Sequence, residues 1–87
     1  MKKIYILLRI GPPEKVRVLA AYSSQKEARE ALNSIANDFI MEVKDGKATT
    51  GFVSTDYEVT KSDTTIYIND PFGLEYRTFQ LQDIHFI

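Results

Sequence analysis

Residues 24–39, SQKEAREALNSIANDF, carry the clearest sign of regular structure in the chain and decide its fold class. Ser24 followed three residues later by Glu27 fits a capping box, in which the serine hydroxyl accepts a hydrogen bond from the Glu27 amide. Apolar side chains then recur at helical spacing and form one stripe among polar neighbours. The stripe consists of Ala28, Ala31, Leu32, Ile35, Ala36 and Phe39. The pattern predicts one amphipathic helix, whose alanines let it lie close to a sheet.

Two strands are predicted before this helix, over residues 2–10 and 16–22. In the first, both alternating faces are mostly apolar, which indicates a central strand or one covered on both sides. One face consists of Ile4, Ile6, Leu8 and Ile10, and the other of Tyr5, Leu7 and Arg9. Gly11-Pro12-Pro13 ends the strand because proline lacks a backbone donor. The short connection favours an antiparallel hairpin.

The residues after the helix predict a series of antiparallel strands. Met41 and Val43 alternate with polar residues and predict a short strand, and Asp45-Gly46 favours a two-residue hairpin turn. Further strands are predicted over residues 47–60, 64–69 and 74–81, with a bulge at Gly51, a turn at 69–73 and a short apolar end at 84–87. We therefore predict a single α+β domain over residues 1–87. Its sheet is mainly antiparallel, the element order is β-β-α-β-β-β-β, and the helix packs on one face.

Composition limits the possible partners and compartments. The chain has 11 Lys and Arg residues against 12 Asp and Glu, so nucleic acid is not favoured as a partner. No apolar run approaches the ~20 residues that span a membrane, so no membrane partner is expected. The first residues loosely imitate a signal peptide, but Arg9 and the prolines interrupt the apolar segment. Because cysteine is absent, we expect an unprocessed cytoplasmic protein.

Most motifs that carry chemistry are missing. The sequence contains no Gly-rich phosphate loop and no nucleophile elbow. Without cysteine it has no thiolate nucleophile or thiolate zinc ligand, and one histidine cannot form an HExxH motif. We therefore expect no cofactor and no metal.

Two pairs of polar residues are candidates for chemistry. Asp83 and His85 are two residues apart, so on a strand they share a face and can form an acid/base dyad, a pair of metal ligands or simply a polar sheet edge. Asp56 and Glu58 have a spacing compatible with paired carboxylates that act on glycosides, but alternating acids beside Thr and Ser are typical of a solvated strand face.

Tyrosine and arginine residues predict an interaction surface. Tyr5, Arg9, Arg17, Tyr67 and Arg77 alternate with the most apolar positions of their strands, so neighbouring strands would give a face that mixes the two residue types. Such a face suits protein binding, stacking of single-stranded bases, or mere packing of tyrosine rings on arginine stems. Phe72, within the turn at 69–73, either folds back over the core or is held out for a partner.

The sequence from Ile4 to Leu7, AYSSQKEA at 21–28 and Ala31-Leu32 resemble the beginning of small uncharacterised bacterial and phage domains. In these, a β-hairpin leads into a Tyr-Ser-Ser helix cap. The resemblance lies within residues 1–40, and it implies the hairpin and the capped helix but no activity, ligand or catalytic residue.

The leading interpretation is a small non-enzymatic protein-interaction or accessory module. The apolar residues Phe86 and Ile87 are either buried or part of a symmetric contact, which makes a homodimer one form of this hypothesis. The alternatives are a ligand-binding domain or enzyme that uses His85 with Asp83, and a nucleic-acid-associated module.

Overall fold

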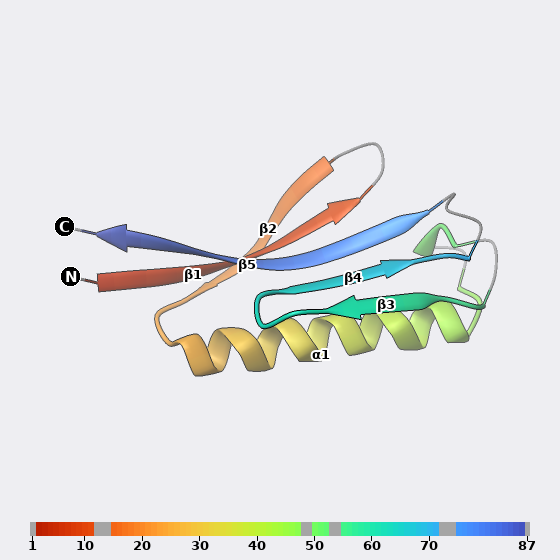
Figure 1. Ribbon diagram of the computed structural model, residues 1–87, viewed down its shortest axis with the longest axis horizontal. Helices are drawn as coiled ribbons and strands as arrows, with labels where there is room; N and C mark the ends of the chain where they lie inside the picture. The colour runs from red at the N-terminus through yellow and green to blue at the C-terminus, as the bar shows by residue number, and fades with distance from the viewer. Residues whose placement is uncertain (1, 12–14, 48–49, 53–54, 72–74, 87) are drawn as a thin grey trace.

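A computed structural model describes residues 2–11, 15–47, 50–52, 55–71 and 75–86. In these residues one helix lies against one side of a single antiparallel sheet (Figure 1). The elements are β1 (Lys2–Gly11), β2 (Lys15–Tyr22), α1 (Gln25–Lys44), β3 (Glu58–Lys61), β4 (Thr65–Asn69) and β5 (Tyr76–Phe86), and the strand order is β2-β1-β5-β4-β3. The α+β class, the antiparallel sheet and the helix on one face are confirmed.

The two longest strands, β1 and β5, form the middle of the sheet. They pair antiparallel from Lys2 opposite Phe86 to Ile10 opposite Thr78, so the two ends of the chain lie side by side (Figure 1). The prediction that the first strand is central is confirmed. The last strand does not end at residue 81 as predicted but continues to Phe86, because β1 supplies backbone partners for β5 from Thr78 to Phe86.

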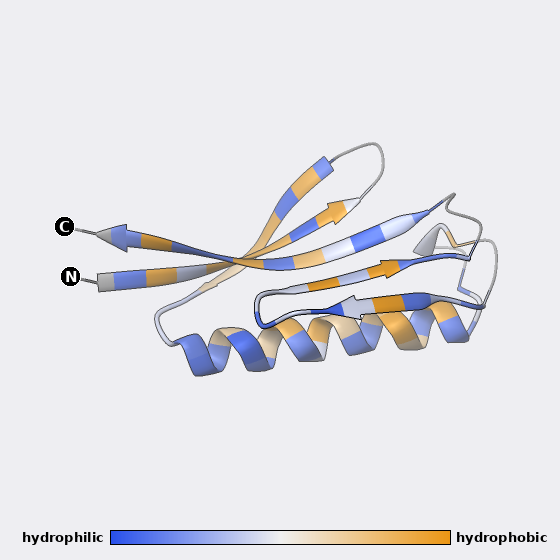
Figure 2. Cartoon of the chain, viewed as in Figure 1, coloured by the Kyte–Doolittle hydropathy of each residue, from blue (hydrophilic) through white to orange (hydrophobic). Residues whose placement is uncertain are grey.

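The helix begins where the sequence predicts. The Ser24 hydroxyl accepts a hydrogen bond from the Glu27 amide at 3.4 Å, which is the first half of the capping box. The predicted stripe faces the sheet, and Ala28, Leu32 and Ala36 are buried. Figure 2 shows the corresponding alternation of apolar and polar bands along the helix.

The predicted strand at Met41–Val43 is wrong, because α1 continues to Lys44. Val43 lies seven residues after Ala36, so it extends the helical stripe and is buried in the core. Asp45-Gly46 is the helix end and not a hairpin turn. The Gly46 amide donates to the Val43 carbonyl and the Lys47 amide to the Glu42 carbonyl, at 3.0 and 3.1 Å, which is a Schellman motif.

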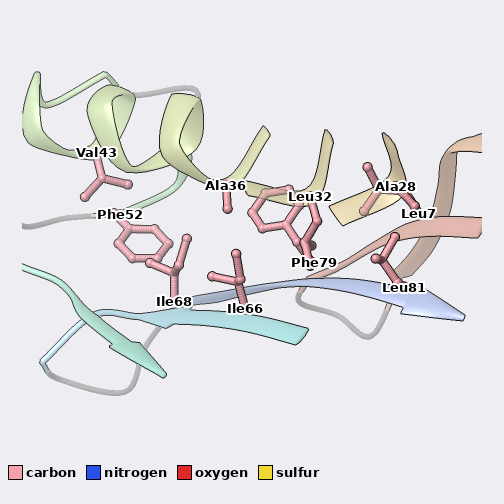
Figure 3. Close-up of a cluster of buried hydrophobic side chains, with 10 residues drawn as sticks. All are labelled: Leu7, Ala28, Leu32, Ala36, Val43, Phe52, Ile66, Ile68, Phe79 and Leu81. Carbon is pink, nitrogen blue, oxygen red and sulfur yellow. The ribbon is translucent and has the colours of Figure 1, made fainter. Parts of the chain in front are cut away.

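The core lies between α1 and the sheet (Figure 3). Leu7, Ile66, Ile68, Phe79 and Leu81 point from β1, β4 and β5 toward the buried residues of the helix. Phe39 of the helix meets Phe52 and Phe79 edge-on, with ring centroids 5.5 and 5.8 Å apart. These contacts fix which side of each strand faces the helix.

The segment after the helix contains less strand than predicted. Of residues 47–60, only Glu58–Thr60 are described as strand, and Val53 and Ser54 lie outside the described residues. Gly51 is not a bulge: it has φ of 79°, in a turn that Thr50 fixes by donating to the Lys47 carbonyl and accepting from the Phe52 amide. This turn places Phe52 in the core.

A bulge shapes the hairpin of β1 and β2. The register shifts between Leu7 and Leu8, which lie opposite Ala20 and Val18, so Leu19 is the extra residue and packs against the core. Bulges bend a strand and increase its twist. Beyond this point the hairpin turns away from the helix layer (Figure 1).

Candidate functional site

The side of the sheet that faces away from α1 is apolar over β1 and β2. Leu7 of β1 and Leu81 of β5 lie opposite each other and both point into the core. Because side chains alternate along a strand, the residues next to each of them point to the other side of the sheet. We call this side the outer face; it consists of Ile4, Ile6, Leu8, Ile10, Val16, Val18, Ala21, Tyr76, Thr78, Gln80, Gln82 and Ile84 on β1, β2 and β5. None of the described elements covers it (Figure 1). Val16 and Val18 are 61% and 63% exposed.

The helix packs on the less apolar of the two faces of β1. Tyr5, Leu7 and Arg9 point toward the helix side, whereas the unbroken aliphatic series of β1 points to the outer face. Removing apolar surface from water is favourable by roughly 25 cal/mol per Å². A sheet face of this composition therefore favours a second covering layer.

Charge is divided between the two sides of the sheet. Among the described side chains of β1, β2 and β5, every Lys, Arg, Asp and His points to the helix side: Lys3, Arg9, Lys15, Arg17, Arg77, Asp83 and His85. The described side chains on the outer face of these three strands carry no charge.

The predicted Tyr/Arg surface is split by this division. Tyr5, Arg9, Arg17 and Arg77 share the helix side, but Tyr67 lies on the other side because Arg77 pairs with its neighbour Ile68. Tyr67 stacks on Tyr76, with ring centroids 6.0 Å apart. Phe72 lies outside the described residues.

Three of these arginines converge at the end of the hairpin. Together with Gly11, Lys15 and Val16, the side chains of Arg9, Arg17 and Arg77 line a concavity of about 480 Å³. We call it the basic hollow. Arg9 lies directly opposite Arg17, and Lys15 directly opposite Gly11. Sequence reasoning selected the arginines but missed Lys15 and Gly11, which the hairpin register brings to them.

Arg77 is held by the protein at the inner wall of the hollow. Its guanidinium donates to the carbonyl oxygens of Thr50 and Tyr76 at 2.8 and 3.1 Å and forms an ion pair with Glu75 at 3.4 Å. It also lies over the Phe39 ring, 5.2 Å from the centroid. The side chain is only 15% exposed, so Arg77 is anchored, whereas Arg17 and Lys15 are exposed.

Asp83 and His85 come together as their spacing predicts. The His85 Nε2 and Asp83 Oδ2 atoms are 3.2 Å apart, and Lys3 Nζ lies 3.7 Å from the same carboxylate oxygen. All three side chains are about half exposed. Asp83 borders a hollow of about 80 Å³, well below the ~300–1,000 Å³ of typical ligand sites. The geometry is that of a solvated polar cluster at the sheet end.

In the part of the chain that the structure describes, no group of three or more Asp, Glu or His side chains is placed to hold a metal ion. No helix among the same residues has the length and apolar content needed to cross a membrane. Asp56 and Glu58 are both exposed on the surface.

Comparisons with known proteins found no match: no protein-family model, no curated protein and no solved structure matches this chain.

Proposed function

We propose that this chain is a small non-enzymatic interaction module that forms a homodimer through its outer face. The observation that carries the proposal is which face of β1 the helix covers. α1 packs on the less apolar face and leaves the other without a covering layer among the described elements; this second face consists of Ile4, Ile6, Leu8 and Ile10. Because the chain has no cysteine, we place this module in the reducing cytoplasm.

A second copy is the occupant that the charge distribution favours. Across a two-fold axis each surface patch meets itself, so charges on the patch would repel their own counterparts. The described outer face of β1, β2 and β5 carries no charge, and it therefore avoids this cost. A charged partner would instead leave its own ions buried and unpaired. Two such faces can pack as aligned sheets, about 10 Å apart.

The size of the outer face fits a dimer of modest affinity. β1 has 10 residues, which at ~3.3 Å each extend about 33 Å, and three strands ~4.8 Å apart cover about 14 Å. The planar footprint is on the order of 450 Å², and side-chain relief increases the accessible area. Standard interfaces bury roughly 800 Å² per partner, and weak ones less than about 600 Å². We therefore expect a dissociation constant in roughly the micromolar range.

Sedimentation velocity across about 1 µM to about 1 mM protein tests the proposal. The wild-type chain should shift from monomer to dimer with concentration. Val18→Glu places a charge on the outer face, where it meets apolar surface in the dimer, and should raise the dissociation constant at least about tenfold. Because Val18 is exposed in the protomer, circular dichroism should show the variant folded.

Met41→Glu is the matched control. Met41 is 61% exposed, nearly the same as Val18, but it lies on the helix away from the outer face. This variant should dimerise as the wild type does. A wild-type chain that stays monomeric throughout the range would contradict the proposal, and so would a Met41→Glu effect as large as that of Val18→Glu.

A further inference from the structure

Apart from Val16, which belongs to the outer face, the residues that line the basic hollow lie on the opposite side of the sheet, so binding in the hollow does not require dimerisation. Arg9, Lys15 and Arg17 give it three positive charges, and Arg77 adds a fourth that Glu75 partly neutralises. The whole chain has a net charge of −1, so this is a local concentration of cations in a slightly acidic protein.

The cations repel one another in the ligand-free protein. Arg9 and Arg17 are direct cross-strand partners, with Cα atoms roughly 4.5–5.5 Å apart in an antiparallel pair. Like charges in this position are destabilising. In the described part of the chain, no carboxylate lies within ion-pair distance of Arg9, Lys15 or Arg17. A bound anion would remove this repulsion.

The hollow is formed before any ligand arrives. Gly11 lies between Lys15 on one side and Arg77 on the other, and a Cβ atom at this position would clash with the Arg77 guanidinium. The missing side chain thus makes room for the Arg77 guanidinium beside Gly11. Arg77 is fixed by its bonds to Thr50 and Tyr76, so one wall of the hollow is rigid. Such preorganisation lowers the entropy lost on binding.

We propose that the basic hollow binds a small molecule that carries two or more phosphate groups. Three cations without an ion-pair partner among the described residues favour a multivalent anion, since a single carboxylate would leave most of the charge uncompensated. Guanidinium groups match phosphate oxygens through paired hydrogen bonds, and lysine adds a point charge. The volume of about 480 Å³ falls within the range of small-molecule sites.

A small anion fits the surface better than a nucleic acid strand. Nucleic-acid binding needs a positive surface that continues along the backbone. Here the described side chains on the outer face of β1, β2 and β5 carry no charge, and the exposed side of α1 alternates Lys26 and Arg29 with Glu27, Glu30 and Asp38.

Calorimetric titration of the full chain at low salt with pyrophosphate and with tripolyphosphate tests the site. Both should bind one per protomer, tripolyphosphate more tightly than pyrophosphate, and orthophosphate more weakly than either. Arg17→Gln and Lys15→Gln should each weaken binding at least about fivefold, since each removes one charge–phosphate contact. Arg29→Gln, on the exposed side of the helix, is the matched control and should bind as the wild type does.

A stability measurement separates loss of the site from loss of the fold. Arg17→Gln should raise the melting temperature of the ligand-free protein, because it removes the repulsion with Arg9. Failure of wild-type protein to bind either polyphosphate would overturn the proposal, as would equal binding by Arg17→Gln. Affinity for single-stranded oligonucleotides that rises with their length, without binding of tripolyphosphate, would assign the hollow to nucleic acid and overturn it as well.

Discussion

At the scale of single residues, Arg77 differs from the other cations of the basic hollow because the protein uses its donors. Its Nη2 atom donates to the carbonyl of Thr50, a residue that is 1% exposed and 27 positions earlier in the chain. Arg77 therefore fastens the turn after the helix to the beginning of β5. The same guanidinium lies over the Phe39 ring, which adds a cation–π contact.

Arg77→Met tests this role. The substitution leaves the buried Thr50 carbonyl without its donor and should lower the free energy of unfolding by about 2–3 kcal/mol. Urea denaturation followed by circular dichroism measures the change. Arg29→Met, on the exposed side of the helix, should stay within about 0.5 kcal/mol of the wild type. An equal effect of the two substitutions would show that the contacts of Arg77 contribute nothing to stability.

Whether the contacts of a single residue can be predicted from sequence depends on how far along the chain its partners lie. The convergence of Asp83 and His85 followed from the two-residue period of one strand, and it is confirmed at 3.2 Å. The anchoring of Arg77 could not be predicted, because Thr50 reaches it only through the folded turn. That Tyr67 and Arg77 lie on opposite sides of the sheet likewise depends on the register of β4 with β5.

At the scale of elements, the end of α1 rests on the conformation of Gly46. Its φ of 70° lies in the left-handed region, and a Cβ atom at this position would make an ordinary van der Waals contact with Thr55 Cγ2 at 3.7 Å, without a clash. Gly46→Ala should therefore destabilise through backbone strain alone, by about 1–2 kcal/mol in urea denaturation. Gly46→Asn should cost less, since asparagine tolerates this region. Equal effects of alanine and asparagine would contradict the assignment to backbone strain.

Elements whose hydrophobic pattern extends over many residues were predictable, and those decided by tertiary pairing were not. The helix start, the hairpin and the central position of β1 follow from local patterns. Three residues of alternation at Met41–Val43 fit a strand as well as a helix, and packing of Val43 in the core decides for the helix. Both faces of β1 are mostly apolar, so the sequence could not say which one the helix covers. The hollow needs the β1–β2 and β1–β5 registers together.

At the scale of the whole molecule, a net charge of −1 conceals a marked separation of charge. On its three longest strands, the described side chains of one face carry no charge, and a group of cations lies at one end of the other face. Sequence composition averages over both, which is why it gave no sign of an anion site. The molecule is also elongated, 45 × 23 × 20 Å. The end of the hairpin turns away from the helix layer (Figure 1), and no residue of α1 lines the hollow.

This separation predicts different salt dependences for the two proposed activities. Anion binding in the hollow is electrostatic, so raising sodium chloride from about 0.05 M to about 0.5 M should weaken tripolyphosphate binding at least about tenfold. Dimerisation through the outer face, whose described side chains on β1, β2 and β5 carry no charge, should be nearly insensitive to the same change. Sodium fluoride, a second salt of monovalent ions, should leave dimerisation equally unchanged. Sedimentation and calorimetry on the wild-type chain in matched buffers measure both. A dimer that dissociates in parallel with anion release would mean that the copies meet through the charged side of the sheet, and the assignment of the outer face would then be wrong.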